Sequence, residues 1–419
     1  MSRRRLDQAY ANGYGLSDLI QAGNVAICVA PQVYHVLKSS AHTAGLWGVV
    51  NGLWSQQWKA KLAAMALGID LDFTELWAHL SCASLQEKRD GSKLLALPEN
   101  ARTLLRIAGL RTVFVREWYD RLADMVLKVV PSGEPPQNMI TGTPGIGKSI
   151  FGVYLLYLCA LRQQSVVYHT DSAATLFFSF DSSGNPIARV IQKVEFERFK
   201  RDRSVLYVAD TDSPEMGFSG VWISSPRPLM QAHKWLGQST DSCTRYVPLW
   251  TDEELTRLLQ HCYPDAEQHM PPIDRMQEYI QAGATRAEVF GAVPRYLLAK
   301  HLAAPVQMLL GAIQNANLEQ LGRDIAKQLQ CRSESCHMIL HMFPIDDSFT
   351  VPHFRFASEP AKRAAVDVII ARDHEAAKQW IRQLSRVPEA AAVRGALLEA
   401  LNTRASQAAR QVEKPISRE

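Results

Sequence analysis

The sequence lacks a hydrophobic run long enough to cross a lipid bilayer. Its longest apolar stretch, FGVYLLYLCAL at 151–161, has 11 residues, whereas a spanning helix needs about 20. The first ten residues, MSRRRLDQAY, are basic, but no apolar stretch follows them, so no secretory signal is seen. These absences predict a soluble intracellular protein.

An excess of charge of one sign is also missing, and cysteine is scarce. Lys and Arg number 46 against 42 Asp and Glu, a net charge of +4, which is too small to indicate nucleic-acid binding by itself. The seven cysteines are scattered and odd in number, which favours free thiols over a disulfide framework. Hydrophobic residues make up 47% of the 419 residues, enough for a core in each of two or three domains.

The N-terminal quarter reads as mostly helical, from residue 1 to about 110. Trp47, Trp54 and Trp58 recur on one face of a helix expected at 46–67. Such a face indicates either packing in a core or a surface for a partner protein. The spacing alone leaves both readings open.

The rest of the chain changes from α/β patterns to helical ones. A helix is expected at 112–130, and the Pro- and Gly-rich segment 131–137 ends it. Short apolar strands then alternate with helices, which is typical of a doubly wound parallel sheet. The expected strands are 138–141, 165–170, 205–210, 220–225 and 244–250, with a hairpin formed by TLFFSF and IARVI. Thr251 and Glu254 form a capping box that starts a helix, and from about 255 the chain reads as mostly helical.

A glycine-rich loop carries the clearest chemistry. It consists of Gly142, Thr143, Pro144, Gly145, Ile146, Gly147, Lys148 and Ser149. The loop matches G-x-x-x-x-G-K-[ST] and lies between an expected strand and an expected helix. Its glycines let successive N–H groups point at phosphates, and the helix adds its positive N-terminal end. Lys148 is expected to reach the β- and γ-phosphates from the loop surface, and the Ser149 hydroxyl to bind Mg²⁺. The loop predicts a P-loop NTPase whose cofactors are Mg²⁺ and ATP or another nucleoside triphosphate.

Such a site also needs a carboxylate at the end of a buried strand. VLYVAD ends in Asp210, which we expect to be the metal partner. Asp212 follows two residues later and could orient the attacking water or serve as a turn residue. Many ATPases with an additional strand carry a glutamate directly after the metal-site Asp, but Thr211 stands there in this chain. The absence of a glutamate at this position favours weak turnover of the nucleotide.

Two later segments could sense the nucleotide. The strand at 220–225 ends in Ser224 and Ser225, where a polar side chain could contact the γ-phosphate or cap the strand. Arg295 follows a Gly/Pro break in GAVPRY, at the start of an expected helix. An arginine at this place could reach back to the nucleotide and assist catalysis.

These segments together resemble a known family. ITGTPGIGKSIFGVYLLYL, the strand ending in Asp210, the SSP segment, YVPLWTDEEL and FGAVPRYLL occur in this order, which resembles the NTPase region of Crinkler (CRN) proteins and their retrotransposon-hot-spot-like relatives. Crinklers are oomycete and fungal effectors, and the resemblance covers residues 95–405. It implies an ATPase core followed by a restriction-endonuclease-like nuclease domain, with Arg295 as a second nucleotide sensor. It also implies secretion into a host cell and action in the host nucleus.

The chain departs from the family pattern in two places. Nothing at 1–95 matches the leucine-rich LFLAK-type translocation motif. Only RGALLE at 394–399 looks like the start of the nuclease, and the 20 residues after it cannot build a metal-dependent nuclease site. Glu399 is therefore expected to be an ordinary surface residue of a helix.

A zinc site is not expected. Cys331, Cys336, His337 and His341 lie within 11 residues. However, the adjacent Cys336 and His337 point to different faces of a helix, so both cannot easily bind one tetrahedral ion.

The sequence therefore predicts four regions and one leading function. The regions are a helical N-terminal part at 1–110, a P-loop NTPase core at 111–263, a helical lid or winged-helix-like part at 264–385, and a nuclease-like remnant or tail at 386–419. The leading function is slow ATP hydrolysis as a conformational switch. The alternative is a non-catalytic protein that the nucleotide stabilises and that binds a host protein through its N-terminal region. DNA is a further candidate partner, whereas a membrane is not.

Overall fold

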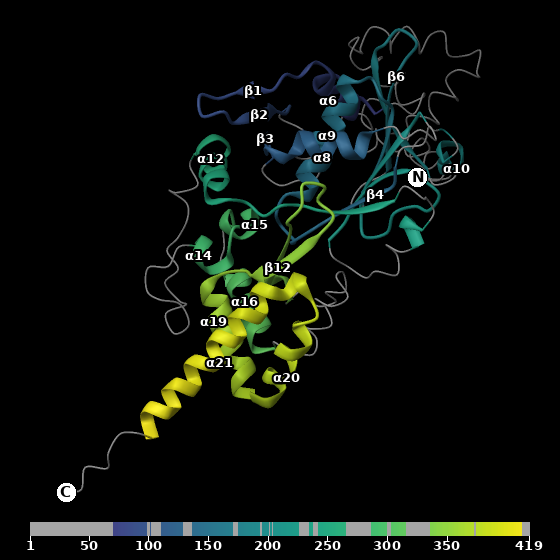
Figure 1. Ribbon diagram of the computed structural model, residues 1–419. Coiled ribbons are helices and arrows are strands. Elements are labelled where there is room, and N and C mark those ends of the chain that lie inside the picture. Colours follow the sequence, from purple (N-terminus) through teal and green to yellow (C-terminus); the bar gives the residue numbers. More distant parts are fainter. Residues whose placement is uncertain are drawn as a thin grey trace, which may run out of the picture.

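A computed structural model of the chain shows two lobes, one above the other in the view of Figure 1. It describes residues 70–98, 101, 110–128, 136–170, 175–192, 195–200, 202, 204–225, 234–237, 242–264, 286–299, 303–315, 336–372 and 374–412. The upper lobe in Figure 1 holds the larger sheet, and the lower lobe is made mainly of helices from the C-terminal third. The tryptophan-rich helix expected at 46–67 lies outside the described residues.

A seven-stranded mixed sheet forms the centre of the upper lobe. Its order is β10-β4-β9-β8-β5-β6-β7. Its strands are β4 (Asn138–Thr141), β5 (Val166–Thr170), β6 (Thr175–Phe180), β7 (Pro186–Ile191), β8 (Leu206–Asp210), β9 (Gly220–Ile223) and β10 (Cys243–Tyr246). The first five strands in this order pair in parallel, whereas β6 pairs antiparallel with both β5 and β7. The sequence predicted these strand positions closely.

The prediction of a parallel sheet holds for five of the seven strands, and the sheet is antiparallel at one edge. The expected hairpin is present, and its first strand continues the sheet by pairing with β5. A tight turn suffices for antiparallel neighbours, whereas parallel neighbours need a long crossover. The Asp181 carboxylate builds this turn by accepting hydrogen bonds from the N–H groups of Ser183 and Asn185, both at 2.8 Å.

The sheet separates two hydrophobic clusters because successive strand residues face opposite sides. Tyr168 and Val208 face the cluster that contains helix α9 (Lys148–Leu161), whereas Val167 and Tyr207 face the other cluster. Helix α9 carries buried, mostly apolar residues on all of its faces, so most of the helix lies in the interior of the protein. Helices α6 (Leu71–Cys82) and α8 (Trp118–Leu127) lie near α9 on this side of the sheet (Figure 1). The burial of α9 fixes the residues at its N-terminus against the sheet.

A small antiparallel sheet precedes α8, which the sequence did not predict. It has the order β1-β2-β3 and consists of β1 (Gln86–Glu87), β2 (Lys93–Ala96) and β3 (Thr112–Val115). The helix expected at 112–130 therefore begins only at Trp118. Residues 112–115, TVFV, are β-branched or aromatic and pair as a strand with KLLA at 93–96. The described part of 1–110 is accordingly not purely helical.

The lower lobe contains a β-hairpin among its helices. Helix α12 (Asp252–Cys262) lies beside β3 of the upper lobe (Figure 1). The helices that follow it are α14 (Arg286–Phe290), α15 (Pro294–Leu297), α16 (Ala303–Gln314), α18 (Cys336–Ile339), α19 (Glu359–Arg372), α20 (His374–Leu384) and α21 (Ala391–Val412). The hairpin strands are β11 (Leu340–Pro344) and β12 (Pro352–Phe356). The prediction of a mostly helical C-terminal region did not place this hairpin, whose turn the Asp346 carboxylate holds through the N–H groups of Thr350 and Val351.

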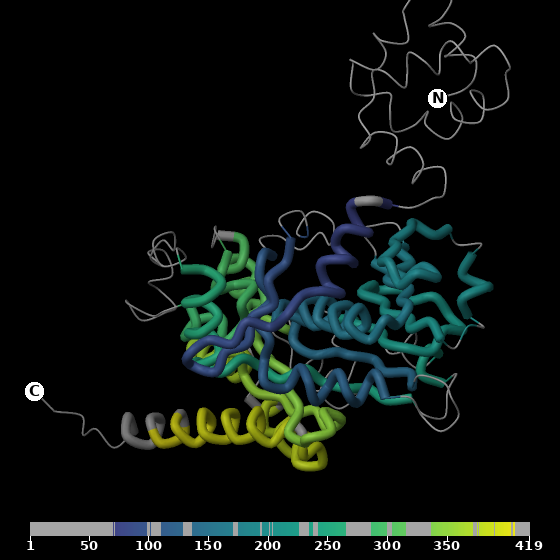
Figure 2. Tube along the Cα trace, turned by 90° about the horizontal axis from the view of Figure 1, so that it is seen from above, coloured from purple at the N-terminus to yellow at the C-terminus, as the bar shows by residue number. Residues whose placement is uncertain are grey.

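The two ends of the molecule stand out in the second view. Helix α21 extends away from the lower lobe, and the described part of the chain begins at the opposite side (Figure 2). Within the described ranges, none of the helices is both long and apolar enough to cross a bilayer.

Candidate functional site

The glycine-rich loop, residues 142–149, connects β4 to α9. Gly142, Gly145 and Gly147 have φ values of 147°, 84° and 101°, in the region that favours glycine. Gly147 lies at the N-cap of α9 and has no side chain, so the first N–H groups of the helix have no side-chain acceptor at the cap. Ser149 lies in this first turn and is half-buried. The loop thus gathers backbone donors at the positive end of a buried helix.

Lys148 is buried rather than on the loop surface, which corrects the expectation from the sequence. Its side chain folds back over the loop, and Nζ donates hydrogen bonds to the carbonyls of Gly142 at 2.8 Å and Thr143 at 3.0 Å. Burial and, to a smaller extent, the positive charge of Arg295 lower the pKa of Lys148 from 10.5 to about 7, and the negative charge of Asp210 opposes this shift. Lys148 therefore lies within electrostatic reach of both residues.

Arg295 packs directly on the glycine-rich loop. A Cβ placed on Gly145 would lie 2.7 Å from the Cβ of Arg295 and 3.1 Å from Val293, so no larger residue fits there. The N–H of Arg295 points at the Gly145 carbonyl, 3.4 Å away. The Arg295 side chain itself is exposed. The Gly/Pro break at 291–294 thus places Arg295, which is 147 positions from Lys148 in the chain, at the glycine-rich loop.

Asp210 ends β8 at the same edge of the sheet. In the parallel register it is level with Thr170 of β5 and with Ile223 of β9, which is in turn level with Ile140 of β4. The carboxyl ends of β4, β9 and β8 therefore meet at one edge, next to the loop that follows β4. Asp210 is half-buried there.

The residues after β8 do not supply a second buried carboxylate. Thr211 is buried; its carbonyl accepts the indole N–H of Trp222 at 2.8 Å, and its hydroxyl accepts the N–H of Ser213 at 3.1 Å. Asp212 is exposed in the bend that follows. Arg295 therefore packs on the loop that holds Lys148, and Asp210 ends a strand at the same edge of the sheet, whereas Asp212 is exposed.

Ser224 follows β9 at this edge. It is buried, its N–H donates to the Ile140 carbonyl at 3.0 Å, and its hydroxyl donates to the Ser225 carbonyl at 2.9 Å. The first bond continues the pairing of β9 with β4, and the second is local to the chain after the strand, which agrees with the capping role that the sequence left open for this residue. Ser225 beside it is half-buried.

Two contacts that the sequence did not reveal hold the glycine-rich loop from outside. The Thr143 hydroxyl bonds to the backbone of Met342 in β11. The Trp250 indole N–H donates to the carbonyl of Ile146 at 2.8 Å. Backbone carbonyls and N–H groups leave no mark in a sequence, so only the nearby VPLW segment could have drawn attention to Trp250.

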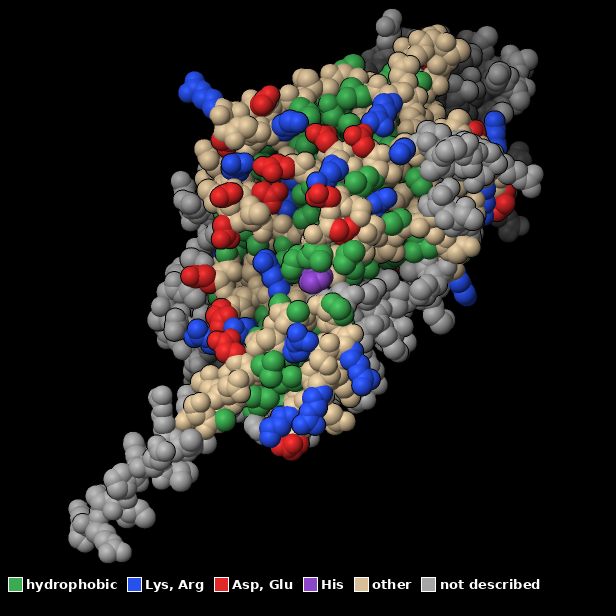
Figure 3. All heavy atoms as spheres, in the orientation of Figure 1, with side chains coloured by type: hydrophobic (Ala, Val, Ile, Leu, Met, Phe, Trp, Pro, Cys, Tyr) green, Lys and Arg blue, Asp and Glu red, His purple; other side chains and the backbone are tan. Residues whose placement is uncertain are grey.

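Charged side chains of both signs are interspersed over the upper lobe in the face that Figure 3 shows, whereas Lys and Arg predominate on the part of the lower lobe seen there. Glu399 of α21 is exposed and forms an ion pair with Lys362 at 3.5 Å, as expected of a surface helix residue.

The segment considered for zinc gives no cluster of ligands. Among the described residues, no group of three or more His, Cys, Asp or Glu could hold a metal ion. Cys331 lies outside these residues. His341 is fully buried in β11, and burial lowers its pKa to about 3, so its ring is neutral.

Comparison with known proteins gives a distant relationship. No family model matches the sequence. The chain is similar to Crinkler effector protein 15 and Crinkler effector protein 16 of Phytophthora infestans, each 24% identical over 223 residues. The match covers 52% of this chain but only 33% of each relative, so the chain spans about a third of the length of these curated relatives. A Crinkler-like relationship therefore holds over half of the chain.

Proposed function

We propose that this chain is a Crinkler-like P-loop ATPase that binds Mg²⁺ and ATP and hydrolyses the ATP slowly as a conformational switch. The observation that carries the proposal is that Arg295 packs on the glycine-rich loop that holds Lys148, while Asp210 ends a strand at the same edge of the sheet. A buried lysine, a strand-end carboxylate and an arginine from three separate segments are the parts that phosphoryl transfer uses. A loop that merely turned the chain would need none of them.

The strand order supports the same proposal. Strand β9 lies between β4, which leads into the loop, and β8, which ends in Asp210. This is the arrangement of ATPases that have an additional strand between these two. Ligands of open α/β sheets bind at the carboxyl ends of the strands, which is where the loop, Asp210 and Ser224 lie.

Each residue has a role that follows from its position. Lys148 would exchange the carbonyls of Gly142 and Thr143 for phosphate oxygens, which compensate its buried charge better. Ser149 and Asp210 would hold the Mg²⁺, which would supply positive charge to neutralise the phosphates. Arg295 would stabilise the charge that develops on the transferred group.

Weak turnover follows from the residue after Asp210. A water-positioning glutamate is replaced by Thr211, which is buried and engaged with Trp222 and Ser213. This observation also favours the alternative function, a protein in which the nucleotide only stabilises a fold that binds a host partner. Phosphate release distinguishes the two functions, because only the ATPase produces it.

The similarity to proteins named Crinkler effectors also supports a proposal about where the chain acts. We propose that the chain acts as an effector inside a host cell, with the ATPase as its switch. A host protein is the partner that this setting implies.

Nucleotide binding is tested by titrating the purified chain with a fluorescent ATP analogue and Mg²⁺. Lys148→Met should weaken binding at least about tenfold, because a charge-assisted contact to phosphate is lost. Lys378→Met is the matched control, since it removes one charge from an exposed lysine of α20 that is paired with Glu375. Wild-type protein that binds no nucleotide, or equal binding by Lys148→Met, would reject the proposal.

A further inference from the structure

The carbonyl of Ile146 lies in the middle of the glycine-rich loop, and the side chain that holds it is Trp250. The indole N–H of Trp250 donates to this carbonyl at 2.8 Å, in an interior from which water is excluded. A carbonyl fixed in this way keeps its peptide plane in one orientation, and the N–H of the next residue, Gly147, belongs to the same plane. Trp250 therefore sets the direction of a backbone donor in the loop.

Trp250 is itself held by a buried arginine. The guanidinium of Arg116 lies 4.3 Å from the centre of the Trp250 ring and 5.0 Å from that of Trp118, so it is stacked between two indoles. Its side chain is only 1% exposed. A charge buried to this extent needs compensation from several partners.

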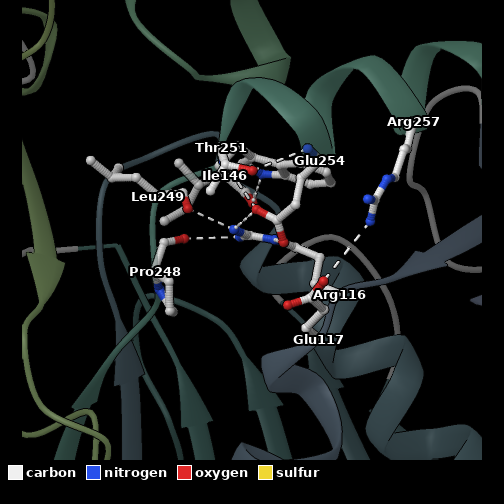
Figure 4. A network of polar contacts seen from close by, with 9 residues as sticks. Arg116, Glu117, Ile146, Pro248, Leu249, Thr251, Glu254 and Arg257 are labelled. Atoms are coloured by element: carbon white, nitrogen blue, oxygen red, sulfur yellow. Dashed lines mark hydrogen bonds and ion pairs between the residues drawn. The ribbon is translucent and has the colours of Figure 1, made fainter. Parts of the chain in front are cut away.

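The partners of Arg116 are the backbone next to Trp250 and one carboxylate. Nη1 donates to the Pro248 carbonyl at 2.9 Å and Nη2 to the Leu249 carbonyl at 2.7 Å. Nε and Nη2 also reach the two oxygens of Glu254 at 2.9 and 2.7 Å. Figure 4 shows the guanidinium pointing between these groups. Arg116 thus fixes both the ring of Trp250 and the chain just before it.

Glu254 joins this arrangement to α12. Its carboxylate also accepts the N–H of Thr251, and the Thr251 hydroxyl accepts the N–H of Glu254, each at 3.1 Å. The capping box and the arginine therefore share one carboxylate (Figure 4). We define the arginine clamp as Arg116, Glu254 and Trp250.

We propose that Trp250 is a positioning residue of the glycine-rich loop, oriented by Arg116 and Glu254, and that it presets the loop for nucleotide phosphates. The inference rests on the proposed function and assigns it a group that touches no nucleotide. Preorganised donors lower the cost of binding because the loop is ordered before the ligand arrives. Loss of the indole N–H would leave the Ile146 carbonyl buried without its partner and the loop free to reorient.

Trp118 provides a matched control. It is buried to the same degree as Trp250 and stacks on the same guanidinium, yet its indole N–H has no hydrogen-bond partner among the described residues. Trp250→Phe and Trp118→Phe thus remove the same atoms beside Arg116. Only Trp250→Phe removes a bond to the loop.

The experiment compares the Kd of Mg²⁺·ADP and the Tm of the unliganded protein for wild type and both variants. Trp250→Phe should raise the Kd about fivefold relative to Trp118→Phe, as expected from the loss of one hydrogen bond, when both are measured well below their Tm values. The Tm of Trp250→Phe should also be the lower of the two, because the Ile146 carbonyl then stays buried without a partner. Equal Kd values for the two variants, with normal binding by the wild type, would overturn this inference and leave the proposed function standing. A wild type that does not bind Mg²⁺·ADP would reject the proposed function itself.

A second variant keeps the test decisive if Trp250→Phe fails to fold. Glu254→Gln changes no residue of the loop and keeps the shape of the side chain, but it removes the charge opposite Arg116. The Kd of Mg²⁺·ADP should rise in this variant beyond that of Glu253→Gln, an exposed neighbour in the same helical turn. Equal Kd values for Glu254→Gln and Glu253→Gln would overturn the role of the arginine clamp.

Discussion

The hydroxyl of Thr143 is hydrogen-bonded to both backbone groups of Met342: it accepts from the N–H at 2.9 Å and donates to the carbonyl at 3.2 Å. Thr143 belongs to the glycine-rich loop and Met342 to β11 of the lower lobe. The two residues are 199 positions apart in the chain. The hairpin of the lower lobe is therefore tied directly to the proposed nucleotide site.

This link predicts a difference between two small substitutions. Thr143→Val keeps the shape of the side chain but leaves the buried Met342 N–H and carbonyl unpaired, so it should lower the free energy of unfolding by about 1–3 kcal/mol. Thr143→Ser keeps the hydroxyl and should cost less. Urea unfolding of both variants measures the difference, and equal stability of the two would show that the bonds to Met342 contribute nothing.

Asp210→Asn should separate binding from turnover. The amide can still accept a hydrogen bond from a metal-bound water, but it no longer balances the charge of Mg²⁺. Phosphate release should fall about a hundredfold, whereas the affinity for the nucleotide should change much less. Asp212→Asn is the control, because Asp212 is exposed in the following bend. Loss of turnover in Asp212→Asn alone would assign the catalytic carboxylate to Asp212.

Arg295→Gln should reduce hydrolysis without affecting the fold. The Cβ and Cδ of Arg295 pack against Gly145, and a glutamine keeps a carbon atom at each of these positions, while the guanidinium of this exposed residue is lost. Single-turnover hydrolysis should slow about a hundredfold or more, as for other arginines that stabilise phosphoryl transfer, with an unchanged Tm. Arg363→Gln, on the exposed face of α19, is the control. A normal rate in Arg295→Gln would show that this arginine only packs against the loop.

The sequence predicted the large sheet better than the small elements around it. Strands such as VLYVAD are short, apolar and bounded by turn residues, so their pattern alone is sufficient. TVFV at 112–115 was assigned to a helix because it runs without a break into the helical pattern that follows. Its pairing with KLLA at 93–96 is a contact between separate segments, which a local pattern does not show. The hairpin around Asp346 was missed for a similar reason, since its strands are mixed in polarity.

The candidate site, like the fold, could be predicted only in part. The motif around Lys148 identified the loop, and the Gly/Pro break before Arg295 indicated an arginine that reaches it. The burial of Lys148 and the bond from Trp250 to Ile146 could not be predicted. Both depend on backbone carbonyls and on packing between distant segments, which residue identity does not encode locally.

The burial of Lys148 also predicts how stability depends on pH. Its folded pKa of about 7 lies below the 10.5 of an exposed lysine, so between these values the unfolded chain binds more protons than the folded one. The contribution of Lys148 to stability must therefore rise as the pH increases from about 7 to about 10. Lys148→Met removes this contribution, while the cysteines and tyrosines that also titrate in this range stay the same in both proteins. The Tm of wild type minus that of Lys148→Met should thus increase with pH between 7 and 9.5 in the absence of nucleotide. A difference that is constant or falls with pH would show that Lys148 keeps its proton in the folded protein, held by the carbonyls of Gly142 and Thr143.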